Sequence, residues 1–157
     1  MTKSNLFYLF GSAFLCAALA SRGSSEDRKI AMADAPVAVQ KTLTEQLRSG
    51  KLRSLIAEVE NGRTTYEEEL TVDGRNKTVA IQADGRLLES ETSVNLNSLP
   101  AAVRDGLVRE ARKGSLSQIE EVTKDGVVSY EAMVKEKGKK DREIVVGADG
   151  RAIAPKQ

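Results

Sequence analysis

Carboxylates are the side chains of this 157-residue chain with the clearest capacity for chemistry. Three stand together in the run Glu-Glu-Glu at 67–69, and one stands in each copy of the tetrapeptide ADGR, at 83–86 and at 148–151. Paired carboxylates can act as general acid and base, and several together can bind a hard cation such as Ca²⁺. Both uses require a particular spacing of the carboxylates along the chain. The spacing therefore distinguishes a chemical role from a structural one.

The spacing favours structural roles for both patterns. A calcium-binding loop needs oxygen ligands at alternate positions and a closing Glu, whereas Asp84 is the only carboxylate of its ADGR copy and Arg86 places a positive charge beside it. Successive side chains of a strand point to opposite faces, so only Glu67 and Glu69 of the acidic run share a side. We therefore expect ADGR to form a turn and the acidic run to lie on a solvated face.

Other catalytic groups are scarce. The chain has no His and a single Cys, Cys16, so His-based acid–base catalysis, nucleophilic triads and zinc binding lack their usual residues. The serines show no nucleophile-elbow pattern, and no spacing picks out a pair of carboxylates. We predict a protein that is not an enzyme, with no catalytic, cofactor-binding or metal-binding residues.

The first twenty residues, MTKSNLFYLFGSAFLCAALA, have the pattern of a secretory signal peptide. Lys3 precedes an apolar run that is short of the about 20 residues of a membrane-spanning helix, and the run ends in small residues that predict cleavage between Ala20 and Ser21. Cys16 leaves an alternative, a lipoprotein acylated at that residue. We expect a secreted or periplasmic protein that contacts a membrane only through an uncleaved signal or a lipid on Cys16.

Removing residues 1–20 leaves a neutral chain that is poor in aromatic residues. Lys3 is the only charge in that segment, so 23 basic and 23 acidic side chains remain. Tyr66 and Tyr130 are the only aromatic residues outside it, and no cysteine is left to form a disulfide. The chain thus lacks the positive field and the stacking platforms that bind nucleic acids, and we expect no nucleic-acid partner.

The remaining sequence aligns with itself at an offset of 64 residues, which becomes 65 at the two ADGR copies. Pro36 matches Pro100, and Tyr66 matches Tyr130, which indicates an internal duplication. Residues 21–33 are polar and lack apolar periodicity. The expected organisation is a signal peptide (1–20), a flexible linker (21–33), a first repeat (34–91), a connector (92–97) and a second repeat (98–157).

Each repeat begins with a helical pattern and continues with strands. Apolar residues first recur at four-residue spacing, and the period then changes to two around Tyr66 and Tyr130, which places both tyrosines in phase with the apolar side of a half-buried strand. We therefore expect both tyrosines in the core. The helical patterns run through Val39, Leu43 and Leu47 and through Val103, Leu107 and Ala111; Asp34 and Ser98 are candidate N-caps, and Gly50 and Gly114 fall where the helices would end.

Asn-Gly and Asp-Gly pairs separate the strands, and such pairs favour tight hairpins in which both central residues have positive φ. The ADGR copies predict the last hairpin of each repeat, between strands 77–82 and 86–91 and between strands 142–147 and 151–154. The predicted fold class is α+β: two tandem repeats, each an N-terminal helix followed by a three- to four-stranded antiparallel meander sheet, with the helices packed on one face. A unit of about 60 residues is marginal alone, so we expect the two sheets to abut; two loosely tethered domains are the alternative.

This order of elements resembles the PepSY-like domain family, which is described as β-lactamase-inhibitor-like. The resemblance covers roughly residues 34–154, judged on the repeat pattern. It implies that the two tyrosines and the ADGR glycines define the fold, whereas the disulfide within each repeat of the β-lactamase inhibitor protein is lacking here. The residues that carry the resemblance are the helix openings Ala35-Pro36 and Leu99-Pro100, the strands around Tyr66 and Tyr130, and the segments 79–87 and 144–152, which contain Gly85 and Gly150.

The resemblance implies an exported, non-catalytic module that binds a protein or peptide, such as an inhibitor of, or a partner for, a secreted or periplasmic hydrolase or peptidase. Two alternatives remain: an envelope structural or stress-related protein, and a module that captures a peptide at a free sheet edge. The side chains that alternate with the tyrosines on their strands form the candidate partner surface: Thr65, Glu67, Glu69, Glu131, Met133 and Lys135.

Overall fold

The computed structural model describes residues 26–48, 50–60 and 62–154, so the signal peptide, the Ala20–Ser21 cleavage site and Cys16 lie outside the described residues. Two helices and one eight-stranded antiparallel sheet form an α+β fold in which the strands neighbour one another in chain order. The elements are β1 (Glu26–Lys29), α1 (Val37–Leu47), β2 (Lys51–Glu60), β3 (Arg63–Val72), β4 (Arg75–Gln82), β5 (Leu87–Ser93), α2 (Ala101–Ala111), β6 (Ser115–Lys124), β7 (Val127–Lys135) and β8 (Arg142–Gly147).

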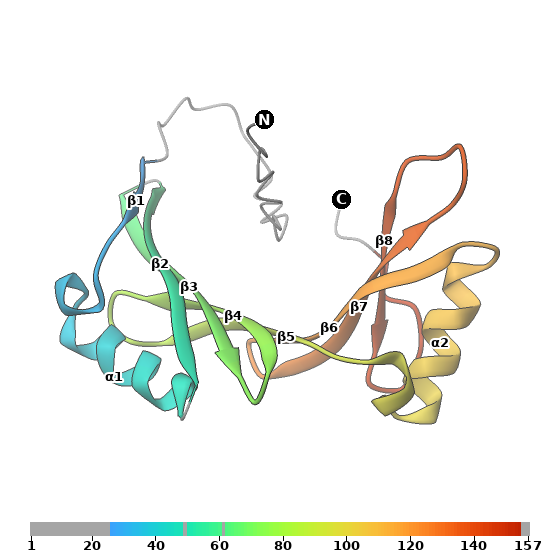
Figure 1. The fold of residues 1–157 in the computed structure, drawn as a ribbon, viewed down its shortest axis with the longest axis horizontal. Coiled ribbons are helices and arrows are strands. Elements are labelled where there is room, and N and C mark those ends of the chain that lie inside the picture. Colours follow the sequence, from blue (N-terminus) through green and yellow to red (C-terminus); the bar gives the residue numbers. More distant parts are fainter. Residues whose placement is uncertain (1–25, 49, 61, 155–157) are drawn as a thin grey trace, which may run out of the picture.

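Both helices cover the same face of the sheet and leave the other face open. Leu70 lies in the core under α1, and Tyr130 lies in the core under α2. The strand register joins these two residues in one cross-strand row through Lys77, Thr92 and Glu121, and residues directly opposite one another share a face. Figure 1 shows the sheet bending between the two helices, which lie on its outer side. The uncovered face is therefore the inside of the curve.

Each helix closes its own hydrophobic core. Val39 and Leu43 of α1 and Val103 and Leu107 of α2 are fully buried, as their spacing predicts. Burial of an apolar side chain contributes about 1.5–3 kcal/mol, so these helix faces account for much of the packing energy. The two tyrosines lie in the cores, as expected: the first core contains Tyr66 with Leu55, Leu70, Val79 and Ile81, and the second contains Tyr130 with Ala132, Val134, Ile144 and Val146.

A polar seam joins the first half (residues 26–93) to the second half (residues 94–154). At this seam β5 pairs with β6, with Ser90 opposite Thr123 and Thr92 opposite Glu121. Lys124 Nζ also donates to Glu89 Oε2 at 2.8 Å across the same pair of strands. The two sheets thus form one continuous sheet, and the alternative of two loosely tethered domains is wrong.

The structure corrects the expected start of the ordered fold. Residues 26–29, placed in a flexible linker on their polar composition, form β1, whose backbone pairs with β2. A short 3₁₀ helix, Met32–Asp34, then leads into α1. Strand pairing supplies backbone hydrogen bonds whatever the side chains are, which is why composition alone missed this edge strand.

The helix starts are also corrected. Pro36 and Pro100 occupy the N-cap positions, without a side-chain cap hydrogen bond. Asp34 and Ser98, the expected caps, each end a 3₁₀ turn two residues earlier. The sequence placed the caps too early because the 3₁₀ turns take up the polar residues that usually signal a helix start.

Both ADGR segments form turns that pack against the start of a helix. In each copy the Asp side chain accepts a hydrogen bond from the Arg backbone N–H, at 3.0 Å in the first and 2.9 Å in the second. Only the glycines, Gly85 and Gly150, have positive φ (88° and 77°), so the expectation of two positive φ values is wrong for ADGR. A Cβ on Gly150 would lie 2.0 Å from the Ala102 carbonyl oxygen of α2. Glycine is thus required by both backbone conformation and contact.

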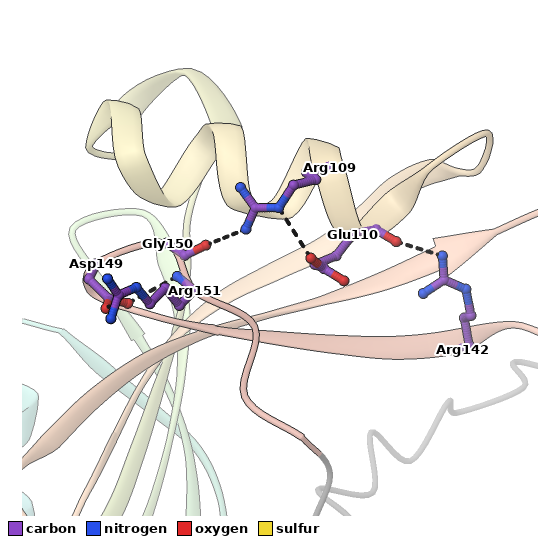
Figure 2. A network of polar contacts seen from close by, with 6 residues as sticks. All are labelled: Arg109, Glu110, Arg142, Asp149, Gly150 and Arg151. Carbon is purple, nitrogen blue, oxygen red and sulfur yellow. Dashed lines mark hydrogen bonds and ion pairs between the residues drawn. The ribbon is translucent and has the colours of Figure 1, made fainter.

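The two ADGR turns lead into different structures. The first joins β4 to β5 as a hairpin, as predicted. After the second, the expected strand at 151–154 is reduced to one bridge between Val146 and Ala152, supported by a hydrogen bond from Ile153 N to Val145 O at 2.9 Å. Figure 2 shows Arg109 of α2 donating to the Gly150 carbonyl oxygen, at 2.8 Å, which ties this turn to the helix.

Candidate functional site

The candidate site is the open face of the sheet, which the strand register defines residue by residue. Cross-strand rows connect Glu67 of β3 through Ala80 to Glu89 of β5, and Glu120 of β6 to Glu131 of β7. These rows lie on the opposite side of the sheet from the buried tyrosines, because side chains alternate along each strand. No helix covers them, which leaves this face available to a partner.

Charge is unevenly distributed on the open face. Carboxylates lie along the middle of the strands, whereas the cations lie at strand ends, which gives the centre a negative potential although residues 21–157 carry no net formal charge. Lys124, at the end of β6, forms an ion pair with Glu89. The register places these charged residues on the open face: Asp27, Glu58, Glu67, Glu69, Glu89, Glu91, Glu120, Glu131 and Glu143, and Lys29, Lys51, Arg63, Lys124 and Lys135.

Crowding of these carboxylates changes their acidity. Partial burial raises the pKa of Glu67, and repulsion from the Glu58 and Glu91 carboxylates raises it further. Burial, together with repulsion from Glu91 and Glu143, raises the pKa of Glu120 to about 6. Positive charge at the open face is therefore favourable, whether it comes from protons that bind the carboxylates or from the cations of a partner.

Glu131 and Glu143 form a hydrogen-bonded carboxyl pair on this face. They lie on neighbouring strands, and burial of Glu131, its hydrogen bond with Glu143 and repulsion by Glu143 raise the pKa of the Glu131 carboxyl. A hydrogen bond between two carboxyl groups requires a proton on one of them, because an ionised carboxylate can only accept. A cation from a partner could replace that proton.

Glu68 behaves differently from its two neighbours. Its side chain is fully buried on the helix-covered face, between Leu55 and Val79 in the strand register, and neither carboxyl oxygen has a hydrogen-bond partner among the described residues. Burial, followed by repulsion from Glu67, raises the pKa of Glu68 to about 9. The carboxyl is therefore neutral at pH 7, and the expected solvated role is wrong for this residue.

The acidic face lacks the geometry of a metal centre. Among the residues that the structure describes, no group of three or more His, Cys, Asp or Glu side chains converges on a point where a cation could sit. The carboxylates are instead spread over several strands about 4.8 Å apart. This spread suits an extended cationic surface better than a single ion.

The six residues predicted as a partner surface all lie on the open face, in two groups. Thr65, Glu67 and Glu69 come from β3, whereas Glu131, Met133 and Lys135 come from β7, and the four strand spacings between them correspond to about 19 Å along the sheet. Whether these residues contact a partner remains a prediction.

Sequence reasoning missed the other carboxylates of the open face: Asp27, Glu58, Glu89, Glu91, Glu120 and Glu143. The relative positions of Glu89, Glu91 and Glu120 depend on the pairing of β5 with β6, which joins segments about 30 residues apart in the chain. Once this pairing is known, alternation along β5 and β6 places these three residues on the open face. The sequence predicted that the two sheets abut, but not which strands meet or in what register.

Comparison with solved structures identifies the fold. A protein from Bacteroides eggerthii that is described as periplasmic is 17% identical in sequence, with a TM-score of 0.63, and the match covers 76% of this chain and 86% of that one. A BLIP-like protein from Bacteroides fragilis is 19% identical, with a TM-score of 0.61 over 78% and 85% of the two chains. A DUF2874 family protein from Bacteroides ovatus is 16% identical, with a TM-score of 0.63 over 76% and 85%.

These likenesses show that the chain has a BLIP-like fold, the one expected from the resemblance to β-lactamase-inhibitor-like domains. No protein-family model and no curated protein matches the sequence. The description of the Bacteroides eggerthii protein as periplasmic agrees with the secreted or periplasmic location expected here. No helix among the described residues is long and apolar enough to cross a membrane.

Proposed function

We propose that this chain is an exported, non-catalytic binding module that holds a partner protein with a basic surface against the open face of its sheet. The carboxylates along the middle of that face carry the proposal. A secreted or periplasmic hydrolase or peptidase is the partner class that the BLIP-like fold favours, with the module acting as its inhibitor or accessory partner.

The shape and the charge of the open face support the same conclusion. A curved sheet can surround a convex partner, and a specific interface needs about 800 Å² from each side. Complementary charge speeds encounter and selects partners more than it adds affinity. The carboxyls of Glu120 and Glu131, whose pKa values are raised, gain further from a cationic partner because it offsets the repulsion that each experiences from Glu91 and Glu143.

The edges of the sheet give less support to peptide capture by strand addition. β1 has four residues, which offers few backbone groups to an added strand. The other edge, at β8, is already approached by Ala152 and Ile153, which bond to Val146 and Val145. Capture at an edge therefore ranks behind binding on the open face, and a structural role in the envelope has no specific feature in its favour.

We also infer that the two halves are copies of one helix-plus-meander unit. Matching local geometry supports this inference: the helices end at Arg48 and Arg112, both with positive φ (49° and 55°), and each is preceded by a 3₁₀ turn and a proline. Gly85 and Gly150 occupy equivalent turns that contact the first turn of the helix in their own half.

The proposal is tested by capture with paired variants. The tagged chain without residues 1–20 is incubated with secreted and envelope fractions of its own source, beside a variant carrying Glu69→Lys and Glu143→Lys, two exposed positions on the open face. A matched control carries Glu45→Lys and Asp105→Lys, exposed positions on the two helices. We expect one stoichiometric partner that the unmodified chain and the control retain and the open-face variant releases.

Two results would contradict the proposal. The first is a partner retained equally by all three proteins, which would move the binding surface away from the open face. The second is no partner at all, which would favour a structural role. Unfolding cannot explain a loss of binding by the open-face variant if its melting temperature matches that of the control, and Glu143→Lys should relieve repulsion at Glu131.

A further inference from the structure

A second charged feature lies at the far end of α2, away from the open face, and has the opposite sign. The end of α2 and the turn between β7 and β8 enclose a pocket of about 340 Å³, near the lower limit for small-molecule sites. Five cationic side chains and one carboxylate line it, beside Val134. The lining cations are Arg112, Lys113, Lys139, Lys140 and Arg142, and the carboxylate is Glu136.

Two of the cations are held by the protein itself. Lys139 Nζ forms an ion pair with Glu136 Oε1 at 2.8 Å. Arg142 Nη2 donates to the carbonyl oxygens of Glu110 at 2.8 Å and Ala111 at 3.2 Å, at the end of α2, and Figure 2 shows its contact with Glu110. The guanidinium of Arg142 thus offsets the negative end of the α2 helix dipole, which would otherwise repel an anion bound in this pocket.

The other three cations have no partner of their own. Among the described residues, Arg112, Lys113 and Lys140 make no side-chain hydrogen bond or ion pair. They come from two separate elements, the end of α2 and the β7–β8 turn, and converge on one pocket. Unpaired cations gathered in this way repel one another, so the pocket is more stable with an anion in it.

The pocket arises from a difference between the two halves of the chain. The turn between β3 and β4 has two residues, Asp73 and Gly74, whereas the turn between β7 and β8 runs from 136 to 141 and carries Lys137, Lys139 and Lys140. The longer turn supplies the lysines that face the end of α2. Packing of the sheet does not require this extension, because the short turn serves the same purpose in the first half.

We propose that this pocket binds a small phosphorylated compound through its phosphate group. Lysine ammonium groups and an arginine guanidinium are the usual protein partners of phosphate, with arginine able to donate two parallel hydrogen bonds. The volume exceeds that of a bare ion and accommodates a phosphate with a small organic group attached. A free phosphomonoester and the phosphate of an anionic lipid head group share this chemistry.

Calorimetric titration of the chain without residues 1–20 tests the proposal at constant ionic strength. The probes are inorganic phosphate, pyrophosphate and glucose 6-phosphate, with glucose as the uncharged control, and vesicles of phosphatidylcholine with and without phosphatidylglycerol. We expect at least one phosphate-bearing probe to bind and glucose and plain vesicles not to bind. Binding by soluble phosphates would identify a phosphomonoester site, and binding by phosphatidylglycerol vesicles alone would identify a lipid head-group site.

The matched variants remove two charges each. Lys113→Gln with Lys140→Gln should weaken the affinity about tenfold or more, because each lysine contributes a charge-assisted hydrogen bond. Lys41→Gln with Lys137→Gln is the control: Lys41 is exposed on α1, and Lys137 lies in the same turn but does not line the pocket. Equal affinities for the two double variants, or no binding of any phosphate-bearing probe, would overturn the proposal. Neither result bears on the open face.

Discussion

At the scale of single residues, Glu68 is the strongest departure from a simple sheet protein. The alternation that places Tyr66 and Leu70 in the core places Glu68 there as well, and the equivalent position of the second half is Ala132, which is also buried. A neutral carboxyl without a hydrogen-bond partner costs about 1–3 kcal/mol in such a place. The first half is therefore less stable than its packing alone would make it.

We expect Glu68→Met to stabilise the protein and to flatten its pH dependence. The pKa of Glu68 is about 9 in the folded chain against an ordinary value of 4.5. Between these two pKa values the folded state binds one proton more than the unfolded state. The contribution of Glu68 to stability is therefore complete below the lower pKa and decreases as pH rises. At pH 7 this titration lowers the free energy of unfolding by about 3 kcal/mol. Methionine fills a similar volume and does not titrate, so the variant avoids this decrease. Urea unfolding from pH 5 to pH 9 measures the change.

Glu69→Met is the control for Glu68→Met, because Glu69 is the exposed neighbour on the open face. It should change the unfolding free energy by less than about 0.5 kcal/mol, as surface substitutions usually do. A smaller slope should persist in the Glu68 variant, since Glu120 and Glu131 also have raised pKa values. Destabilisation by Glu68→Met at every pH would show that the Glu68 carboxyl has an interaction partner and stabilises the folded state.

At the scale of elements, the ADGR turns explain why a plain tetrapeptide occurs twice. The aspartate closes the turn, and the glycine lets the turn contact the helix that begins its own half. The sequence predicted the turns, the helices and the central strands, because periodicity and Asp-Gly pairs are local signals. It did not predict the contact with the helix or the strand β1, because both depend on residues distant in the chain.

Gly150→Ala tests the contact between turn and helix. Both strain from a positive φ and overlap with the Ala102 carbonyl oxygen oppose the alanine, and we expect a loss of roughly 3 kcal/mol in unfolding free energy. Gly126→Ala is the control, since Gly126 has the same φ of 77° but nothing within 4 Å of its added Cβ. It should lose roughly 1 kcal/mol from strain alone. Equal losses, measured by chemical denaturation, would show that the turn does not need its close contact with α2.

At the scale of the whole molecule, charge is separated in space although residues 21–157 carry no net formal charge. Carboxylates collect on the open face, and cations collect at the end of α2 and at the strand ends. Composition could not show this separation, because a net charge does not say where the charged residues lie. Sequence alternation identified the part of the open face on β3 and β7, whereas the carboxylates of β5 and β6 were placed by the pairing of those two strands.

The most direct measurement of the central claim is the affinity of the captured partner for the open face at several salt concentrations. We expect the Glu69→Lys and Glu143→Lys variant to bind about tenfold more weakly than the unmodified chain, with a weaker salt dependence, whereas the Glu45→Lys and Asp105→Lys control binds normally. Binding at the open face would be contradicted if the affinity changed neither with salt concentration nor in the Glu69→Lys and Glu143→Lys variant, but was lost in the Glu45→Lys and Asp105→Lys control.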